Sequence, residues 1–149
     1  MKRTVVCMLI TAFVLAGCAT PRPFERDDFC TSGTTLLDAH FEGGQLGSCD
    51  ISDDGHFELI LFPEDDPPIN KSPWYAYRVS GQPGDQVNIR MKFHHGYARY
   101  WPKLSLDGKQ WAPVPEDKVA RTADDEMVVT LQLDQARVWV AGQEILARE

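Results

Sequence analysis

Hydrophobic and polar residues alternate strictly along several stretches of this chain. The alternation is clearest in three of them, whose hydrophobic members are Phe57, Leu59 and Leu61, then Val87, Ile89, Met91 and Phe93, and finally Met127, Val129, Leu131 and Leu133. A period of two places alternate side chains on opposite faces of an extended strand. Each stretch therefore predicts a strand with one buried face and one solvent-facing face.

Composition and turn residues indicate further strands. The aromatic stretch Trp74–Val79 predicts a more central strand, and Ala136–Ala141 predicts a last one. Glycine, proline and aspartate clusters separate these stretches, as expected for tight connections. Asp107-Gly108 predicts a hairpin, because glycine accepts the positive φ that hairpin turns require.

The order of these elements predicts an all-β fold. No stretch before Gln143 keeps a helical period, and the strands are short and closely spaced. We expect an antiparallel, jelly-roll-like β-sandwich of about eight strands over residues 35–143, with 144–149 starting a linker or a helix.

The first residues predict export and a lipid anchor. Lys2 and Arg3 precede a short apolar run, and small residues lead to Cys18. Leu15-Ala16-Gly17-Cys18 looks like the lipobox of bacterial lipoproteins, which implies removal of residues 1–17 and acylation of Cys18. Residues 18–34 would then be a flexible, lipidated tether. The alternative is an ordinary signal peptide with an incidental cysteine.

The resemblance to lipoproteins also implies a location. Ala19, rather than aspartate, follows the lipidated position, which by resemblance to Gram-negative lipoproteins favours the periplasmic face of the outer membrane. The whole chain carries a formal net charge of −7, and removal of the signal leaves 13 basic and 22 acidic residues. This acidic balance argues against nucleic acid as a partner.

Two cysteines remain after the signal and the anchor. Cys30 and Cys49 would form a disulfide in an oxidising compartment, closing a loop of about 20 residues that contributes roughly 3 kcal/mol. Two free thiols or a thiolate metal site are the alternatives. No Cys-x-x-Cys motif or nearby histidine pair supports the metal.

No stretch matches a catalytic motif. The serines lie in no nucleophile elbow, and the glycines lie in turn-like segments rather than in a phosphate loop. His40-Phe41-Glu42 and His56-Phe57-Glu58 could supply zinc ligands only if the fold brought them together. The sequence therefore predicts no cofactor, no metal ligand and no catalytic residue.

A polar loop rich in aromatic rings is the remaining candidate site. It contains the potential contact residues His94, His95, Tyr97, Tyr100 and Trp101, and Trp111 follows on a nearby strand. Exposed rings of this kind stack on sugars or contact protein partners. The alternative is that the rings cap one end of the core.

The order of the strands resembles a known domain. Phe41–Leu46, Trp74–Val79, the Tyr100–Trp111 hairpin and Val138–Ala141 are similar to successive segments of the N-terminal β-sandwich domain of cytosolic-carboxypeptidase-type zinc metallocarboxypeptidases. Gln45 stands where that family usually has asparagine, and Ala76 replaces an aromatic residue. In the family this sandwich precedes a zinc-binding peptidase domain with a His-x-x-Glu motif. No His-x-x-Glu occurs here, so no zinc or catalytic residue is carried over.

Three hypotheses follow for the function. The first is a non-catalytic, lipid-anchored module that docks a peptidase domain or another envelope protein. The second is a fragment of a lipid-anchored zinc carboxypeptidase, since the sequence ends about where the peptidase domain would begin. The third is a glycan-binding module that uses the aromatic loop.

Overall fold

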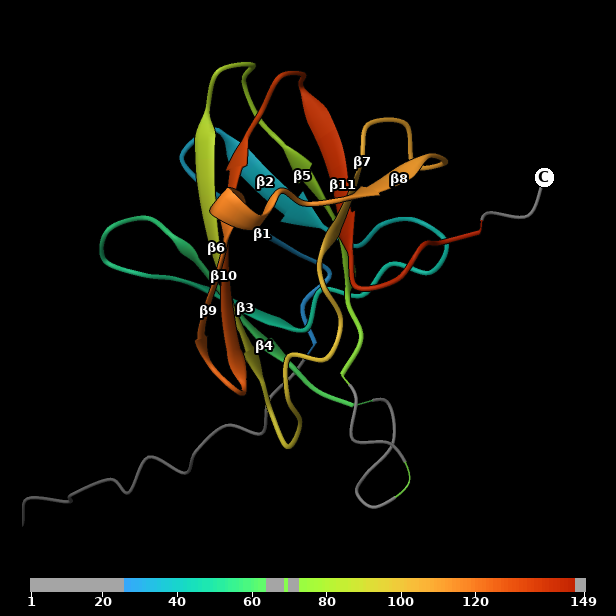
Figure 1. The fold of residues 1–149 in the computed structure, drawn as a ribbon. Helices are drawn as coiled ribbons and strands as arrows, with labels where there is room; N and C mark the ends of the chain where they lie inside the picture. The colour runs from blue at the N-terminus through green and yellow to red at the C-terminus, as the bar shows by residue number, and fades with distance from the viewer. Residues whose placement is uncertain (1–25, 64–68, 70–72, 147–149) are drawn as a thin grey trace, which may run out of the picture.

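The computed structural model describes residues 26–63, 69 and 73–146. The regular elements of this part are short strands and a 3₁₀ helix (Figure 1). The elements are β1 (Phe29–Ser32), β2 (Thr35–Asp38), β3 (Ser48–Ile51), β4 (Phe57–Leu61), β5 (Ala76–Ser80), β6 (Gln86–Phe93), β7 (Lys103–Ser105), β8 (Trp111–Pro113), η1 (Glu116–Lys118), β9 (Val119–Ala123), β10 (Glu126–Gln132) and β11 (Arg137–Ala141).

The strands form two sheets packed face to face. Sheet A has the order β1-β2-β5-β11-β7-β8, and all its neighbours are antiparallel. Sheet B has the order β3-β4-β6-β10-β9. The predicted all-β sandwich is therefore confirmed, with β5 in the interior of sheet A as the aromatic stretch indicated.

The alternating stretches supply the core between the sheets. Every hydrophobic member named in the three predicted strands is at most 4% exposed. The intervening positions of β6 and β10 face outward, because successive side chains of a strand point to opposite faces. Sheet A contributes Leu37, Val79, Val138 and Val140 to the same core.

Two buried tyrosines pack in the centre of this core. The rings of Tyr75 and Tyr77 are stacked with centroids 6.0 Å apart. Burial raises the pKa of both phenols well above the usual range, because the charged form would lose its hydration. The Tyr77 hydroxyl donates to Met91 Sδ at 3.6 Å. The Tyr75 hydroxyl has no partner within the described ranges, so its contribution to the core is that of its ring.

The structure corrects three expectations about the sandwich. It has eleven strands in the described part, not about eight, because strands of three or four residues such as β1, β7 and β8 leave no period in the sequence. It is not wholly antiparallel, since β4 and β6 pair in parallel. The sheet also begins at β1, inside the predicted tether, because Phe29–Ser32 pairs with Thr35–Asp38 across a tight turn.

The predicted disulfide is confirmed. Cys30 on β1 is bonded to Cys49 on β3, so the bond joins an edge strand of sheet A to an edge strand of sheet B. Asp27 reinforces this edge by accepting a 2.7 Å hydrogen bond from the Cys49 backbone N–H. Cys18 and the predicted signal lie outside the described residues. Within the described residues, no helix has the length and apolar character needed to cross a membrane.

Candidate functional site

The outer face of sheet A carries one row of side chains that crosses the sheet. Residues directly opposite each other on paired strands point to the same face. The register pairs Asp38 with Arg78, Arg78 with Trp139, and Trp139 with Ser105. Ser105 in turn pairs with Trp111 on β8. The row therefore has an ion pair at one end and two tryptophans at the other.

The ion pair at the β2–β5 end is buried. Arg78 donates from Nη2 and Nε to the two carboxylate oxygens of Asp38, at 2.6 and 3.0 Å. The side chain of Asp38 is 1% exposed and that of Arg78 20% exposed. Asp38 also accepts from the His40 backbone N–H at 3.0 Å. The pair thereby anchors the segment that follows β2.

That segment turns back over the outer face of the sheet. The Arg78 guanidinium lies 6.0 Å from the centre of the Phe41 ring. The backbone N–H groups of Gln45 and Ala76 each donate a hydrogen bond to the other residue's carbonyl oxygen. Ala76 is the position at which the related domains have an aromatic residue. The turn is tight at Gly44, where an added Cβ would lie 2.1 Å from the Ala39 carbonyl oxygen. Phe41 and Glu42 are therefore held beside the tryptophan end of the row.

A groove lies between this segment, the β7–β8 hairpin and the residues after β11. Figure 1 shows the three segments on the right-hand side of the molecule, in teal, orange and red. The groove measures about 210 Å³, and its apolar walls are Phe41, Trp111, Trp139 and Ile145. Gly108 lies against the Trp139 ring, since an added Cβ there would be 3.5 Å from Trp139 Cε2. The missing side chain keeps the hairpin close to the indole without filling the groove.

Three charged residues also line the groove. They are Glu42, Asp107 and Lys109. The backbone N–H groups of Gln110 and Lys109 donate to Asp107 Oδ1, both at 2.8 Å, which lowers the pKa of this carboxyl below its usual value. Asp107 is therefore ionised at neutral pH. The lining carries one net negative charge.

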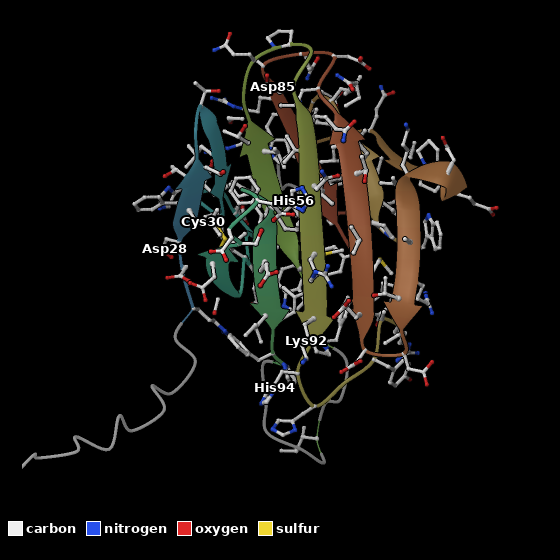
Figure 2. All side chains as sticks on the ribbon, turned by 90° about the vertical axis from the view of Figure 1, so that its left-hand side faces the viewer. Asp28, Cys30, His56, Asp85, Lys92 and His94 are labelled. Atoms are coloured by element: carbon white, nitrogen blue, oxygen red, sulfur yellow. A yellow bond between two sulfur atoms is a disulfide. The ribbon has the colours of Figure 1, made fainter. Side chains whose placement is uncertain are left out.

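The sequence-predicted loop residues do not gather into one site. His94 and His95 follow the end of β6, with ring centroids 3.8 Å apart. Desolvation lowers the pKa of His94, with His95 and Lys92 adding to the effect. Figure 2 places His94 at the same end of sheet B as Lys92. Tyr97 is about half exposed.

Tyr100 and Trp101 lie elsewhere, in a shallow depression of about 540 Å³ that Arg99, Lys103 and Glu144 also line. Neither histidine lines this depression. Trp101 Nε1 donates to the Val114 carbonyl at 2.8 Å, so this ring ties its loop to the segment after β8. The capping role that the sequence left open fits Trp101 better than a free binding platform does.

The outer face of sheet B is polar. Figure 2 shows His56 near the middle of this face. Asn88 accepts from Thr130 at 2.9 Å and lies 3.2 Å from His56 Nε2, so its amide group is the donor to the ring. The other ring nitrogen of His56 faces Asp54 at 3.3 Å. In the part of the chain that the structure describes, no three or more His, Cys, Asp or Glu side chains are grouped so as to hold a metal ion.

Sequence reasoning missed Phe41 and Trp139 as site residues. A signal was present in β11, where Arg137 and Trp139 occupy the same outward phase while Val138 and Val140 point to the core. A large aromatic residue in the polar phase of a strand marks a candidate interaction surface where further apolar side chains adjoin it. The position of Phe41 beside the same groove could not be predicted from this pattern, because it depends on the register of β2, β5 and β11.

Comparisons with known proteins agree on the domain. A family model described as the cytosolic carboxypeptidase N-terminal domain matches residues 37–142. A metallo-carboxypeptidase structure from Burkholderia cenocepacia aligns with 17% identity and a TM-score of 0.52, over 73% of this chain and 29% of that one. A protein from Burkholderia mallei, provisionally described as a carboxypeptidase, aligns with 14% identity and a TM-score of 0.52, over 72% and 28%.

At identities of 14–17%, the two alignments show that this chain shares its fold with part of each of these proteins. This chain spans less than a third of the length of either one. No curated protein matches the sequence.

Proposed function

Because this chain belongs to the family of cytosolic carboxypeptidase N-terminal domains, we propose that it is a non-catalytic, lipid-anchored module that docks a peptidase domain at the bacterial envelope. The observation that carries the proposal is the groove on the outer face of sheet A. Apolar side chains that adjoin one another on the surface of a soluble domain mark interaction sites or ligand-binding grooves. The similar metallo-carboxypeptidase from Burkholderia cenocepacia has further chain, beyond the aligned 29%, that could supply such a surface.

The two faces of the sandwich differ in a way that favours sheet A for docking. Leu106, next to Asp107 in the β7–β8 connection, is 54% exposed, and Leu146, which lines the depression beside Tyr100 and Trp101, is 87% exposed. Sheet B instead presents Glu58, Arg90 and Glu126, joined by ion pairs of 2.8–3.8 Å. Exposed ion pairs of this kind are satisfied by water and by each other, whereas apolar side chains gain free energy when a partner buries them.

Site-specific photo-crosslinking tests the docking. A photoreactive phenylalanine analogue replaces Lys109 at the groove, or Lys92 on sheet B as the matched control, in the full chain expressed in its native cells. We expect the position-109 probe to capture a polypeptide that contains a zinc carboxypeptidase domain, and the position-92 probe to capture none. Equal capture from both positions, or a partner without such a domain, would contradict the proposal. Chelator-sensitive release of C-terminal residues by the purified chain would contradict its non-catalytic part.

The anchor is the second part of the proposal. Ten residues lie between Cys18 and the start of β1 at Phe29. A fully extended chain of that length reaches about 40 Å, so the sandwich would lie close to the membrane surface. Mass spectrometry of the membrane-bound protein is expected to find an acylated N-terminal Cys18. The Cys18→Ser variant is expected to lose that modification, and a wild-type protein with an unmodified residue 18 would overturn the anchor.

A further inference from the structure

The groove combines aromatic faces with negative charge. Its walls include the indoles of Trp111 and Trp139 and the ring of Phe41. Aromatic faces attract cations, and indole does so best. The protein already uses this contact twice, where Arg78 lies 6.0 Å from the Phe41 centroid and Arg99 lies 5.5 Å from the Tyr100 centroid.

Two carboxylates approach the groove from different segments. Glu42 comes from the turn after β2, and Asp107 comes from the β7–β8 hairpin. Within the described ranges, Glu42 forms no ion pair of 4.0 Å or less, and every hydrogen bond that Asp107 accepts goes to Oδ1. Asp107 Oδ2 thus remains available as an acceptor for a ligand.

The third charged residue, Lys109, would affect a neutral sugar and a cationic side chain in opposite ways. Among the described residues that line the groove, Lys109 is the one cation, and its charge opposes that of the two carboxylates. A neutral sugar would gain from the Lys109 ammonium as a hydrogen-bond donor. A cationic side chain would instead be repelled by it, so the effect of removing Lys109 has opposite signs for the two kinds of ligand.

We propose that this groove receives an arginine side chain of the docked partner, a proposal that rests on the docking function above. A guanidinium group stacks flat on indole rings and donates to carboxylates at its edge. Glu42 and Asp107 supply those carboxylates, and Trp111 and Trp139 supply the rings. The formal charge of −7 on the whole chain favours the approach of a basic surface.

The test is a titration with the peptide acetyl-Gly-Arg-Gly-amide, followed by NMR of the tryptophan indole N–H signals. The control peptide carries citrulline, which has the shape of arginine without its charge. We expect the arginine peptide to shift the Trp111 and Trp139 signals and to bind about tenfold more tightly than the citrulline peptide. Trp139→Ala should abolish the binding.

Charge variants provide the sign test. Glu42→Gln and Asp107→Asn are expected to weaken binding of the arginine peptide by about two- to fivefold each, while Lys109→Met strengthens it by a similar factor. Asp107→Asn keeps Oδ1 for the turn and changes only the second oxygen. Equal binding of both peptides, weaker binding in Lys109→Met, or shifts produced by N-acetylglucosamine oligomers instead of arginine would overturn the inference.

The two proposals can fail separately. Capture of a peptidase domain at position 109 without arginine binding would reject the arginine anchor and leave the docking function standing. Arginine binding without capture of a peptidase domain would reject the docking function and leave the groove as a site for a basic side chain of another partner.

Discussion

Replacing Arg78 by methionine is expected to lower the free energy of unfolding by about 3–5 kcal/mol, the usual cost of isolating one member of a buried ion pair. The Asp38 carboxylate is 1% exposed and would keep only the His40 backbone N–H as a donor. A carboxylate that is 1% exposed cannot regain its hydration, and Arg78 is its one ion-pair partner among the residues that the structure describes. Urea unfolding of the purified domain at neutral pH measures the loss.

A second substitution separates the ion pair from general damage to the sheet. Adding Asp38→Asn to Arg78→Met removes the buried charge and is expected to restore at least about half of the lost stability. The matched surface pair is Lys103–Glu144, whose side chains are 33% and 52% exposed. Lys103→Met should cost less than about 1 kcal/mol. If Arg78→Met is as mild as Lys103→Met, the buried pair does not stabilise the sheet as argued.

The ion pair also connects stability to the groove. Arg78 contacts Asp38 on one side and the Phe41 ring on the other, and Trp139 is its cross-strand neighbour. The turn that presents Phe41 and Glu42 therefore depends on a buried interaction one strand away. This arrangement explains why Arg78, at an outward-facing position of β5, is hydrogen-bonded to Asp38 instead of being fully solvated.

The sequence predicted the parts of the fold that are set by local pattern. β4, β6 and β10 have strict alternation, and the core residues they supply were found from it. Asp107-Gly108 marked its hairpin because Gly108 adopts a φ of 73° that most residues avoid. The cysteine pair was found by elimination, since the predicted signal and the predicted anchor would account for the other two cysteines.

Long-range pairing could not be predicted in this way. The parallel contact of β4 with β6 joins strands that are separated by residues 62–85, which include all of β5, and alternation is the same for parallel and antiparallel strands. The groove likewise depends on long-range strand pairing. Its residues come from positions 41, 42, 107–109, 111, 139 and 145, and only the register of sheet A brings them together.

Removing the disulfide is expected to cost about 3 kcal/mol of stability, the chain-entropy value for a closed loop of this size. The Cys30→Ser/Cys49→Ser double variant should unfold at a lower urea concentration than the wild type. Adding reductant should bring the wild type to the value of the variant and leave the variant unchanged. A double variant as stable as the oxidised wild type would contradict the expectation.

The position of this bond gives the loss a specific structural meaning. β1 is an edge strand of four residues that pairs with β2. The disulfide from Cys30 joins it to β3, the Ser32 hydroxyl donates to the Gly55 carbonyl at 2.9 Å, and Asp27 just before it contacts Gly47 and Cys49. Without the bond, β1 should open first, because edge strands with few buried contacts have the lowest local stability. Amide hydrogen exchange at residues 30 and 31 should therefore be faster in the variant than in the wild type, while exchange in β6 changes less. In a chain anchored at Cys18, a mechanical force exerted by the membrane would act first on β1. The disulfide from Cys30 to Cys49 would distribute that force over both sheets, whereas without it the β1–β2 hairpin alone would bear the force.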